Sequence, residues 1–156
     1  MDCSFRTEQG RFNYRVGAII IHENKILMMK NSRDPYYYSI GGRVHLHETM
    51  EQAIIREIYE ETGVLFEIDR MGYIHENFFI LQATGEKFHE LSFYYYMKPI
   101  ENYNFTCRSL TEDGIEEKLV WIPLENIENY EVYPKFFKDR TLTTNNGLLH
   151  IVDIRY

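Results

Sequence analysis

The strongest constraint on the fold of this chain is a helical segment with clear start and stop signals, set among runs of β-forming residues. Thr49 is a good N-cap, and Gln52 three residues later completes a capping box. Gly63 stands where a left-handed residue usually ends a helix. These signals predict a helix over residues 50–62, which must bury one face against a sheet.

Extended segments rich in Tyr, Phe and Ile dominate the rest of the sequence. They are residues 14–22, 26–30, 36–40, 64–68, 72–82, 87–97, 118–122 and 148–154. Residues 72–82 and 87–97 are expected to form a hairpin that turns at Thr84 and Gly85. Pro134 opens a second predicted helix over residues 135–142. The pattern predicts a mixed α/β sandwich, and the lack of a linker or repeat predicts one domain over residues 1–156.

Glutamates gather near the carboxyl end of the first predicted helix. At about 100° of rotation per residue, Glu57, Glu60 and Glu61 fall on one arc beside the apolar face. Like charges at this spacing destabilise a helix by roughly 0.2–0.5 kcal/mol per pair, and the helix dipole disfavours anions in the last turn. One arginine, Arg56, cannot neutralise them all. A divalent cation would relieve the repulsion, and oxygen ligands suit Mg²⁺, Mn²⁺ or Ca²⁺. A solvated acidic face is the alternative.

A longer pattern of fixed positions contains this helix. Five residues separate Gly42 from Glu48, seven separate Glu48 from Arg56, and the run REIYEETGV occupies residues 56–64. With every defining position matched, the segment resembles a complete Nudix box, the motif of the Nudix hydrolase family. The resemblance implies a Nudix-type α/β/α sandwich with a mixed β-sheet, in which the box forms a loop, a helix and a second loop.

The resemblance also implies roles for individual residues of the box. The carboxylates of Glu57, Glu60 and Glu61 would bind one to three divalent ions, normally Mg²⁺ or Mn²⁺. The carbonyl of Gly42 would be a further metal ligand. Arg56 would hold the glutamates in place by salt bridges, and so contribute to catalysis.

The remaining box positions serve structure or vary within the family. Glu48 would stabilise the loop, helix and loop, while Gly41 and Gly63 supply backbone geometry. His45 and His47 stand where many members have an acidic residue and a glycine. Either histidine could contact substrate or metal, and an ordinary surface role is the alternative.

Hydrolysis of a diphosphate needs a metal-activated water that attacks phosphorus and a carboxylate that takes its proton. Glu57 is the first choice for this base. In some members of the family a glutamate from a later loop acts instead, and Glu112, Glu116 and Glu117 stand just before residues 118–122. Of these, Glu116 and Glu117 are preferred as metal ligand or base, with a solvated acidic loop as the alternative.

Two residues on predicted strands are candidate substrate contacts. Arg15, at the start of the first strand, could bind phosphate or a base, or form a structural salt bridge. Glu90 lies in a strand that can line the substrate cleft in this family. An ordinary cross-strand polar role is its alternative.

The resemblance implies a small-molecule nucleotide substrate, a nucleoside diphosphate linked to another group X, and does not identify X. Two other functions stay open. A nucleotide-sensing module would bind without hydrolysis, although such domains usually have eroded boxes and this box keeps its carboxylates. An RNA 5′-end pyrophosphohydrolase would need a basic face, which the formal net charge of −7 does not favour.

Bulk features indicate the surroundings of the protein. Its acidic charge argues against nucleic acid as a partner. The best apolar run, residues 16–21, is strand-sized, which argues against a membrane span. Cys3 and Cys107 are expected to be reduced, and residues 1–10 lack a signal-peptide pattern, so a cytoplasmic protein is expected. Aromatic-rich strands and the habit of the family favour a homodimer over a monomer.

Overall fold

The computed structural model describes residues 1–107 and 109–156. In chain order the elements are β1 (Ser4–Thr7), β2 (Gly10–Ile19), β3 (Ile21–His22), β4 (Lys25–Asn31), β5 (Tyr37–Arg43), α1 (Met50–Thr62), β6 (Ile68–Leu81), β7 (Glu86–Met97), β8 (Glu117–Pro123), η1 (Leu124–Asn129), β9 (Val132–Tyr133), η2 (Lys135–Lys138), α2 (Thr141–Thr144) and β10 (Leu149–Arg155). Within these residues, no helix has the length and apolar character needed to cross a membrane.

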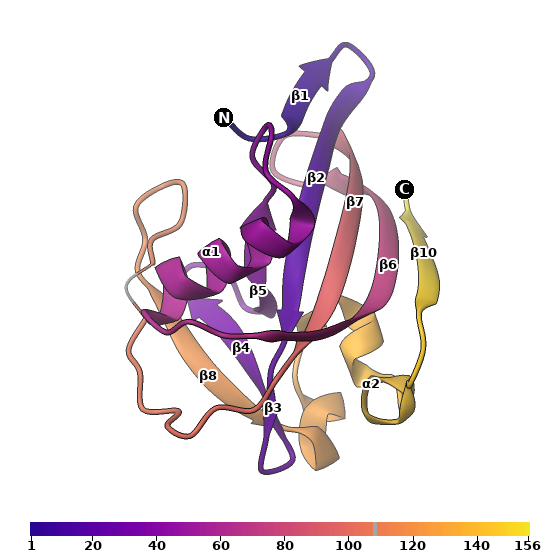
Figure 1. The fold of residues 1–156 in the computed structure, drawn as a ribbon. Coiled ribbons are helices and arrows are strands. Elements are labelled where there is room, and N and C mark those ends of the chain that lie inside the picture. The colour runs from indigo at the N-terminus through magenta and orange to yellow at the C-terminus, as the bar shows by residue number, and fades with distance from the viewer. Residues whose placement is uncertain (108) are drawn as a thin grey trace.

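The strands form a mixed sheet with the order β10-β6-β7-β2-β5-β4-β3. β10 runs parallel to β6 and β2 runs parallel to β7, whereas β6 and β7 are antiparallel. Gly85, with φ of 71°, turns β6 into β7, so the predicted hairpin is confirmed. Figure 1 shows β2, β7 and β6 side by side, with β10 at the edge of the sheet. The mixed sheet that the sequence predicted is confirmed.

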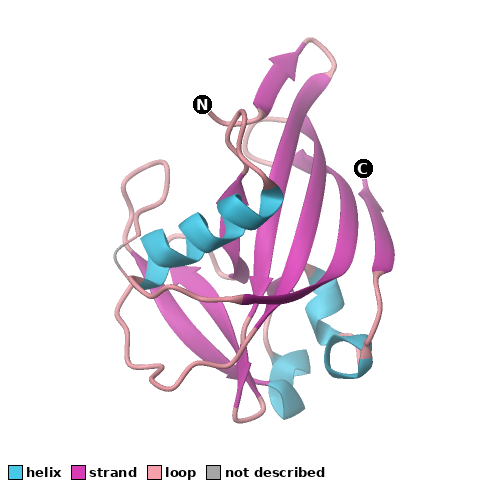
Figure 2. Cartoon of the chain, viewed as in Figure 1, coloured by secondary structure: helices cyan, strands magenta, loops and turns pink. Residues whose placement is uncertain are grey.

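Each face of the sheet carries its own apolar cluster, because successive strand residues point to opposite faces. On one face, α1 packs the fully buried Ile54 and Ile58 against strand residues such as Val16. On the other face, the short helical segments η1, η2 and α2 contribute buried side chains such as Phe137 and Leu142. Figure 2 shows α1 lying across the sheet, apart from these shorter segments. The predicted α/β class is therefore confirmed.

The predicted helix is α1, and it begins and ends at the predicted residues. Thr49 Oγ1 accepts a hydrogen bond from the Gln52 amide at 3.1 Å, and Gln52 Oε1 accepts one from the Thr49 amide at 2.9 Å. Gly63 has φ of 74°, and its amide donates to the Tyr59 carbonyl at 2.7 Å. These caps fix the rotation of α1, and so decide which glutamates face the sheet.

Two predicted elements are wrong. The strand expected over residues 64–68 is a connection, and β6 begins at Ile68 because the chain must first cross from the helix layer to the sheet. The helix expected over residues 135–142 is divided into η2 and α2. Asp139 between them is extended, with ψ of 144°, and its side chain accepts from the Thr141 amide at 2.9 Å. That side-chain bond replaces the backbone bond that a continuous helix would make.

Candidate active site

Arg56 joins the loop before α1 to the carboxylates on the helix. Its Nε and Nη2 donate to the two oxygens of Glu48 at 2.7 and 2.9 Å, and Nη1 donates to Glu57 at 2.8 Å. Nη2 also donates to the Arg43 carbonyl at 3.1 Å. The paired guanidinium, helped by the His45 amide, lowers the pKa of Glu48 to about 2. The structure thus places Arg56 and Glu48 as one ion pair that fixes the loop to the helix.

The Glu61 carboxylate is buried beside a second carboxylate. Glu61 is 7% exposed, and its Oε2 has no hydrogen-bond partner among the described residues. Burial, together with the charges of Glu57 and Glu117, raises the pKa of Glu61 well above its ordinary value, and the Gly41 amide opposes this rise. Burial also raises the pKa of Glu57. Both groups therefore lie where a positive charge would stabilise them.

The two glycines at the end of β5 allow this close approach. A Cβ atom at position 42 would lie 2.5 Å from Cδ and Oε2 of Glu57, so Gly42 leaves the space that the carboxylate fills. Gly41 has φ of 146°, and its Cβ would lie 2.8 Å from Cα of Gly17 on β2. Side chains at these positions would separate β5 from β2 and displace the Glu57 carboxylate.

The remaining predicted metal ligand, Glu60, lies apart from the other two. Its side chain is 55% exposed, and Arg56 Nη1 is 3.4 Å from each of its oxygens. In the described part of the chain, no three His, Cys, Asp or Glu side chains converge closely enough to hold a metal ion. The donor set still fits a divalent cation. The unpartnered oxygen of Glu61, its repulsion from Glu57 and the hard carboxylate ligands all favour one.

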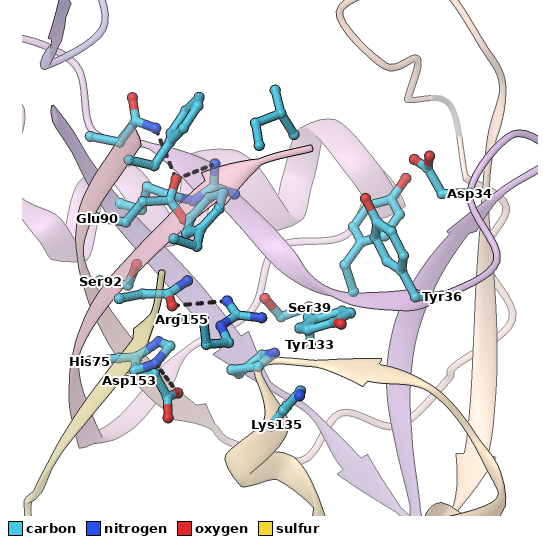
Figure 3. A pocket seen from close by; sticks show the side chains of 18 of the residues that line it. Asp34, Tyr36, Ser39, His75, Glu90, Ser92, Tyr133, Lys135, Asp153 and Arg155 are labelled. Atoms are coloured by element: carbon cyan, nitrogen blue, oxygen red, sulfur yellow. Dashed lines mark hydrogen bonds and ion pairs between the residues drawn. The ribbon is translucent and has the colours of Figure 1, made fainter. Parts of the chain in front are cut away.

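A cleft of about 400 Å³ opens on the sheet face opposite α1. Arg15 faces this cleft, because the next residue, Val16, packs in the cluster with α1. Arg43 is the cross-strand neighbour of Arg15 and also lines the cleft, and its Nε is buried without a partner among the residues described. Arg15 Nη1 lies 3.9 Å from Glu90 Oε2. Figure 3 shows Glu90 on one side of the cleft and Tyr36 across from it.

Glu117 connects the cleft to the carboxylates of α1. Its Oε1 accepts from the Ser109 hydroxyl at 2.6 Å, and its Oε2 accepts from the Tyr38 hydroxyl. Glu117 lines the cleft, and its charge contributes to the raised pKa of Glu61. Of the later glutamates considered from the sequence, Glu117 is therefore the one that the structure brings to the box.

Other residues singled out in the sequence lie elsewhere. Glu116 is exposed and does not line the cleft. Glu112 is also exposed, and it accepts from Arg43 Nη1 at 2.6 Å. His45 lies against the N-terminal segment, with Nε2 3.4 Å from Asp2, and it is outside the cleft. The expected substrate contacts Arg15 and Glu90 share the cleft, whereas His45 does not.

Sequence reasoning did not single out several polar residues of the cleft. Arg43 stands at a variable position of the box, and Tyr38 lies within the predicted extended segment 36–40. His75, Ser92 and Asp153 also line the cleft. The sequence pattern could have indicated them, because polar residues at alternate positions of otherwise apolar strands lie on one face of a sheet.

Comparison with known proteins gives the family. A family model described as NUDIX domain matches residues 11–141, which is most of the chain. The chain belongs to the NUDIX family. A curated ADP-ribose pyrophosphatase of Methanocaldococcus jannaschii is 34% identical, over 45% of this chain and 50% of that protein. A MutT-like protein of Streptomyces ambofaciens is 28% identical, over 39% of this chain and 40% of that protein. The chain thus spans half or less of these curated relatives.

Solved structures support the NUDIX fold. The crystal structure of a MutT protein from Bacillus halodurans superposes with a TM-score of 0.62, covering 88% of this chain and 89% of that chain at 16% identity. At this identity the likeness concerns the fold.

Proposed function

We propose that this chain is a divalent-metal-dependent pyrophosphohydrolase that cleaves the diphosphate linkage of a nucleoside diphosphate derivative. The observation that carries this proposal is the buried Glu61 carboxylate, whose Oε2 has no partner among the described residues and whose charge acts on Glu57 and on the cleft residues Glu117 and Arg15. A cation site next to an anion-binding cleft is the arrangement that phosphoanhydride cleavage requires. The relative named as an ADP-ribose pyrophosphatase supports the same reaction class.

The chain offers separate groups for the metal and for the substrate phosphates. Glu57, Glu60 and Glu61, with the Gly42 carbonyl, would hold Mg²⁺ or Mn²⁺, and a bound ion neutralises phosphate charge and acidifies a coordinated water. Arg15 and Arg43 line the cleft and would bind phosphate oxygens. The diphosphate would therefore lie between the arginines and the carboxylates.

The proton of the attacking water needs a carboxylate. Glu57 is the proposed base, since burial raises its pKa and makes it a better proton acceptor than an exposed carboxylate. As the water oxygen bonds to phosphorus, the bond from phosphorus to the bridging oxygen breaks, and the departing phosphate carries that oxygen away. Glu117 is the alternative base, because it lines the cleft and its charge contributes to the raised pKa of Glu61.

The experiment that tests this function is an assay of purified protein with Mg²⁺ or Mn²⁺. The panel contains ADP-ribose, sugar nucleotides, dinucleoside polyphosphates and triphosphorylated RNA. Metal-dependent cleavage of a diphosphate compound, lost with EDTA and in Glu57→Gln, is the expected result. Release of pyrophosphate from RNA alone would favour an RNA 5′-end enzyme. If nothing is cleaved and Glu60→Gln keeps the nucleotide affinity of the parent, the chain is a nucleotide sensor.

The substitution Gly42→Ala tests the role of Glu57, the proposed metal ligand whose carboxylate lies against Gly42. In Gly42→Ala the new methyl group would occupy the position of the Glu57 carboxylate, so we expect kcat to fall by about 10²-fold. Since a flexible carboxylate can move away, the free energy of unfolding should change by less than about 1 kcal/mol. Steady-state kinetics and urea denaturation measure the two effects. Gly85→Ala, at an open turn with φ of 71°, should show the reverse pattern, lower stability with unchanged kcat.

A further inference from the structure

Arg33 lines the cleft, and the proposed reaction gives it no role. It lies between β4 and β5, and its side chain is 48% exposed. Figure 3 shows the next residue, Asp34, beside Tyr36 and across the cleft from Glu90. Arg43, at the end of β5, lines the same cleft. The cleft therefore carries a positive charge on Arg33 that an anionic group could bind together with Arg43.

A short hairpin before β8 carries two neighbouring acidic residues at its tip. An isolated antiparallel bridge joins the two ends of residues 110–116. Between them the Gly114 amide donates to the Thr111 carbonyl at 2.9 Å, and Gly114 has φ of 78°, which suits a tight turn. The exposed residues Glu112 and Asp113 form the acidic tip of this hairpin. Figure 1 shows the hairpin as the orange loop that projects beyond the start of β8.

Each carboxylate of the acidic tip pairs with a different arginine of the cleft. Glu112 Oε1 accepts from Arg43 Nη1 at 2.6 Å, and Asp113 Oδ2 accepts from Arg33 Nη1. Arg33 Nε also lies 3.4 Å from Asp34 Oδ1. Consecutive Cα atoms are about 3.8 Å apart, so one turn of the chain bridges the two guanidinium groups. Arginine binds carboxylate and phosphate oxygens with the same donors. The acidic tip thus takes the contacts that a phosphate group would make.

The contacts of the acidic tip can be displaced. The side chains of Glu112 and Asp113 are 73% and 70% exposed, and water screens ion pairs of this kind. Arg43 is 17% exposed and is held between Glu112 and Asp2, whose Oδ2 is 3.2 Å from Nη1. A phosphate group gains access to this guanidinium when Glu112 leaves. It also carries more negative charge than one carboxylate and has three acceptor oxygens, so it competes well for the two arginines.

The base of the hairpin is held by separate bonds. Glu117 Oε1 accepts from the Ser109 hydroxyl at 2.6 Å, and the Glu117 amide donates to the Ser109 carbonyl at 3.2 Å. The Tyr38 hydroxyl donates to the other oxygen of Glu117. None of these bonds involves the acidic tip. The tip can therefore leave the arginines while Glu117 keeps its place in the cleft.

We infer that Arg33 and Arg43 form an anion-binding site, which takes a phosphate group of the ligand and which the acidic tip fills when no phosphate is bound. The acidic tip is then a competitor within the chain. A ligand must carry enough negative charge to displace it, so the site selects for phosphorylated compounds over neutral ones. The inference rests on the proposed function for the identity of the substrate as a diphosphate compound, and not for the competition itself.

Pyrophosphate binding in metal-free buffer tests the competition without hydrolysis. The variant Glu112→Gln/Asp113→Asn keeps the shape of the acidic tip and removes both charges, so it should bind pyrophosphate about tenfold more tightly than the parent. Glu125→Gln/Glu128→Gln, at exposed positions of η1, is the control because it changes the net charge equally. The control should bind within about twofold of the parent. Isothermal titration calorimetry measures the three dissociation constants.

A second measurement distinguishes displacement of the acidic tip from a general effect of charge. Arg33→Met removes a phosphate contact and also releases Asp113. It should therefore weaken pyrophosphate binding about threefold in the parent, and about tenfold in Glu112→Gln/Asp113→Asn. The amide signal of Gly114 reports on the tip directly. Saturating pyrophosphate should move this signal in the parent towards its position in the tip variant, whereas sodium chloride of the same ionic strength should not.

Failure of the tip variant to bind pyrophosphate more tightly than the η1 control, or to bind it at all, would overturn the inference. A Gly114 signal that stays fixed as pyrophosphate saturates the protein would do the same. With a hydrolysed substrate, the tip variant should lower KM about tenfold and leave kcat within about twofold, because Glu117 stays in place. The two proposals fail separately. Competition in the binding assay without hydrolysis of any compound refutes the enzyme and supports the anion-binding site. Hydrolysis without competition refutes the anion-binding site alone.

Discussion

Replacing Glu61 with glutamine is expected to abolish hydrolysis without destabilising the fold. The side chain is 7% exposed and its Oε2 has no partner among the residues described, so it contributes little hydrogen bonding to the folded state. A neutral amide of the same shape removes the repulsion from Glu57 and the burial of a charge. It also removes an anionic metal ligand. We expect kcat to fall by on the order of 10³-fold or more.

The pH dependence of stability gives this prediction a second readout. Burial and neighbouring carboxylates raise the pKa of folded Glu61 well above its ordinary value of 4.5. Between these two pKa values the folded protein holds a proton that the unfolded chain has released. Stability without metal must therefore fall as pH rises through that window. Glu61→Gln has no proton to lose, so its stability should fall less over the same range.

Denaturation by urea at pH 5 and pH 8, in EDTA and in Mg²⁺, measures both effects. The parent should gain stability from Mg²⁺ at pH 8, and Glu61→Gln should gain less, because a bound ion stabilises the folded state by mass action. Glu128→Gln, at an exposed position of η1, is the control for loss of one negative charge. A Glu61→Gln variant that still hydrolyses the substrate at the parent rate would contradict the proposed metal site.

The bounds of α1 and the placement of its glutamates could be predicted because the residues that determine them are close together in the sequence. Caps fix the ends of α1, and helical spacing then places Glu57 and Glu61 on the side that faces the sheet. The position of Glu117 was not predictable to one residue, since Glu116 precedes it in the same loop. Pairing of β8 with β4 decides between them: Glu117 opposes Asn31 and points into the cleft. The register of β8 against β4 depends on contacts between segments that are distant in the sequence, so the sequence pattern alone does not determine it.

The grouping of polar residues along the cleft beside β10 was not predictable from the sequence for the same reason. Asp153 is remote in sequence from His75, and parallel pairing of β10 with β6 brings them together. Polar residues such as Ser92 look like ordinary strand positions until the neighbouring strands are known. The cytoplasmic location, the homodimer and the choice between Mg²⁺ and Mn²⁺ stay predictions. They depend on the cell compartment, on a second copy of the chain and on the metal ions available, which neither a local sequence pattern nor the fold of one chain determines.

Loss of the Arg56 side chain is expected to cause the largest fall in stability. Its side chain is 23% exposed and that of Glu48 is 14% exposed, so Arg56→Met leaves a largely buried carboxylate without its partner. Removing one member of a buried ion pair costs about 3–5 kcal/mol. We expect a loss near 3 kcal/mol at pH 7, measured by urea denaturation. Arg33→Met, which breaks the surface pair with Asp113, should cost less than about 1 kcal/mol.

The sign of the pH effect distinguishes this ion pair from a simple packing loss. Arg56 lowers the pKa of folded Glu48 to about 2, below its ordinary 4.5, so the stabilisation is complete above 4.5 and disappears as pH falls towards 2. The difference between parent and Arg56→Met should therefore shrink at pH 3. Replacing both residues with methionine should cost less than the sum of the single changes, because no unpaired charge remains. Additive losses that do not change with pH would show that Arg56 acts through its apolar stem.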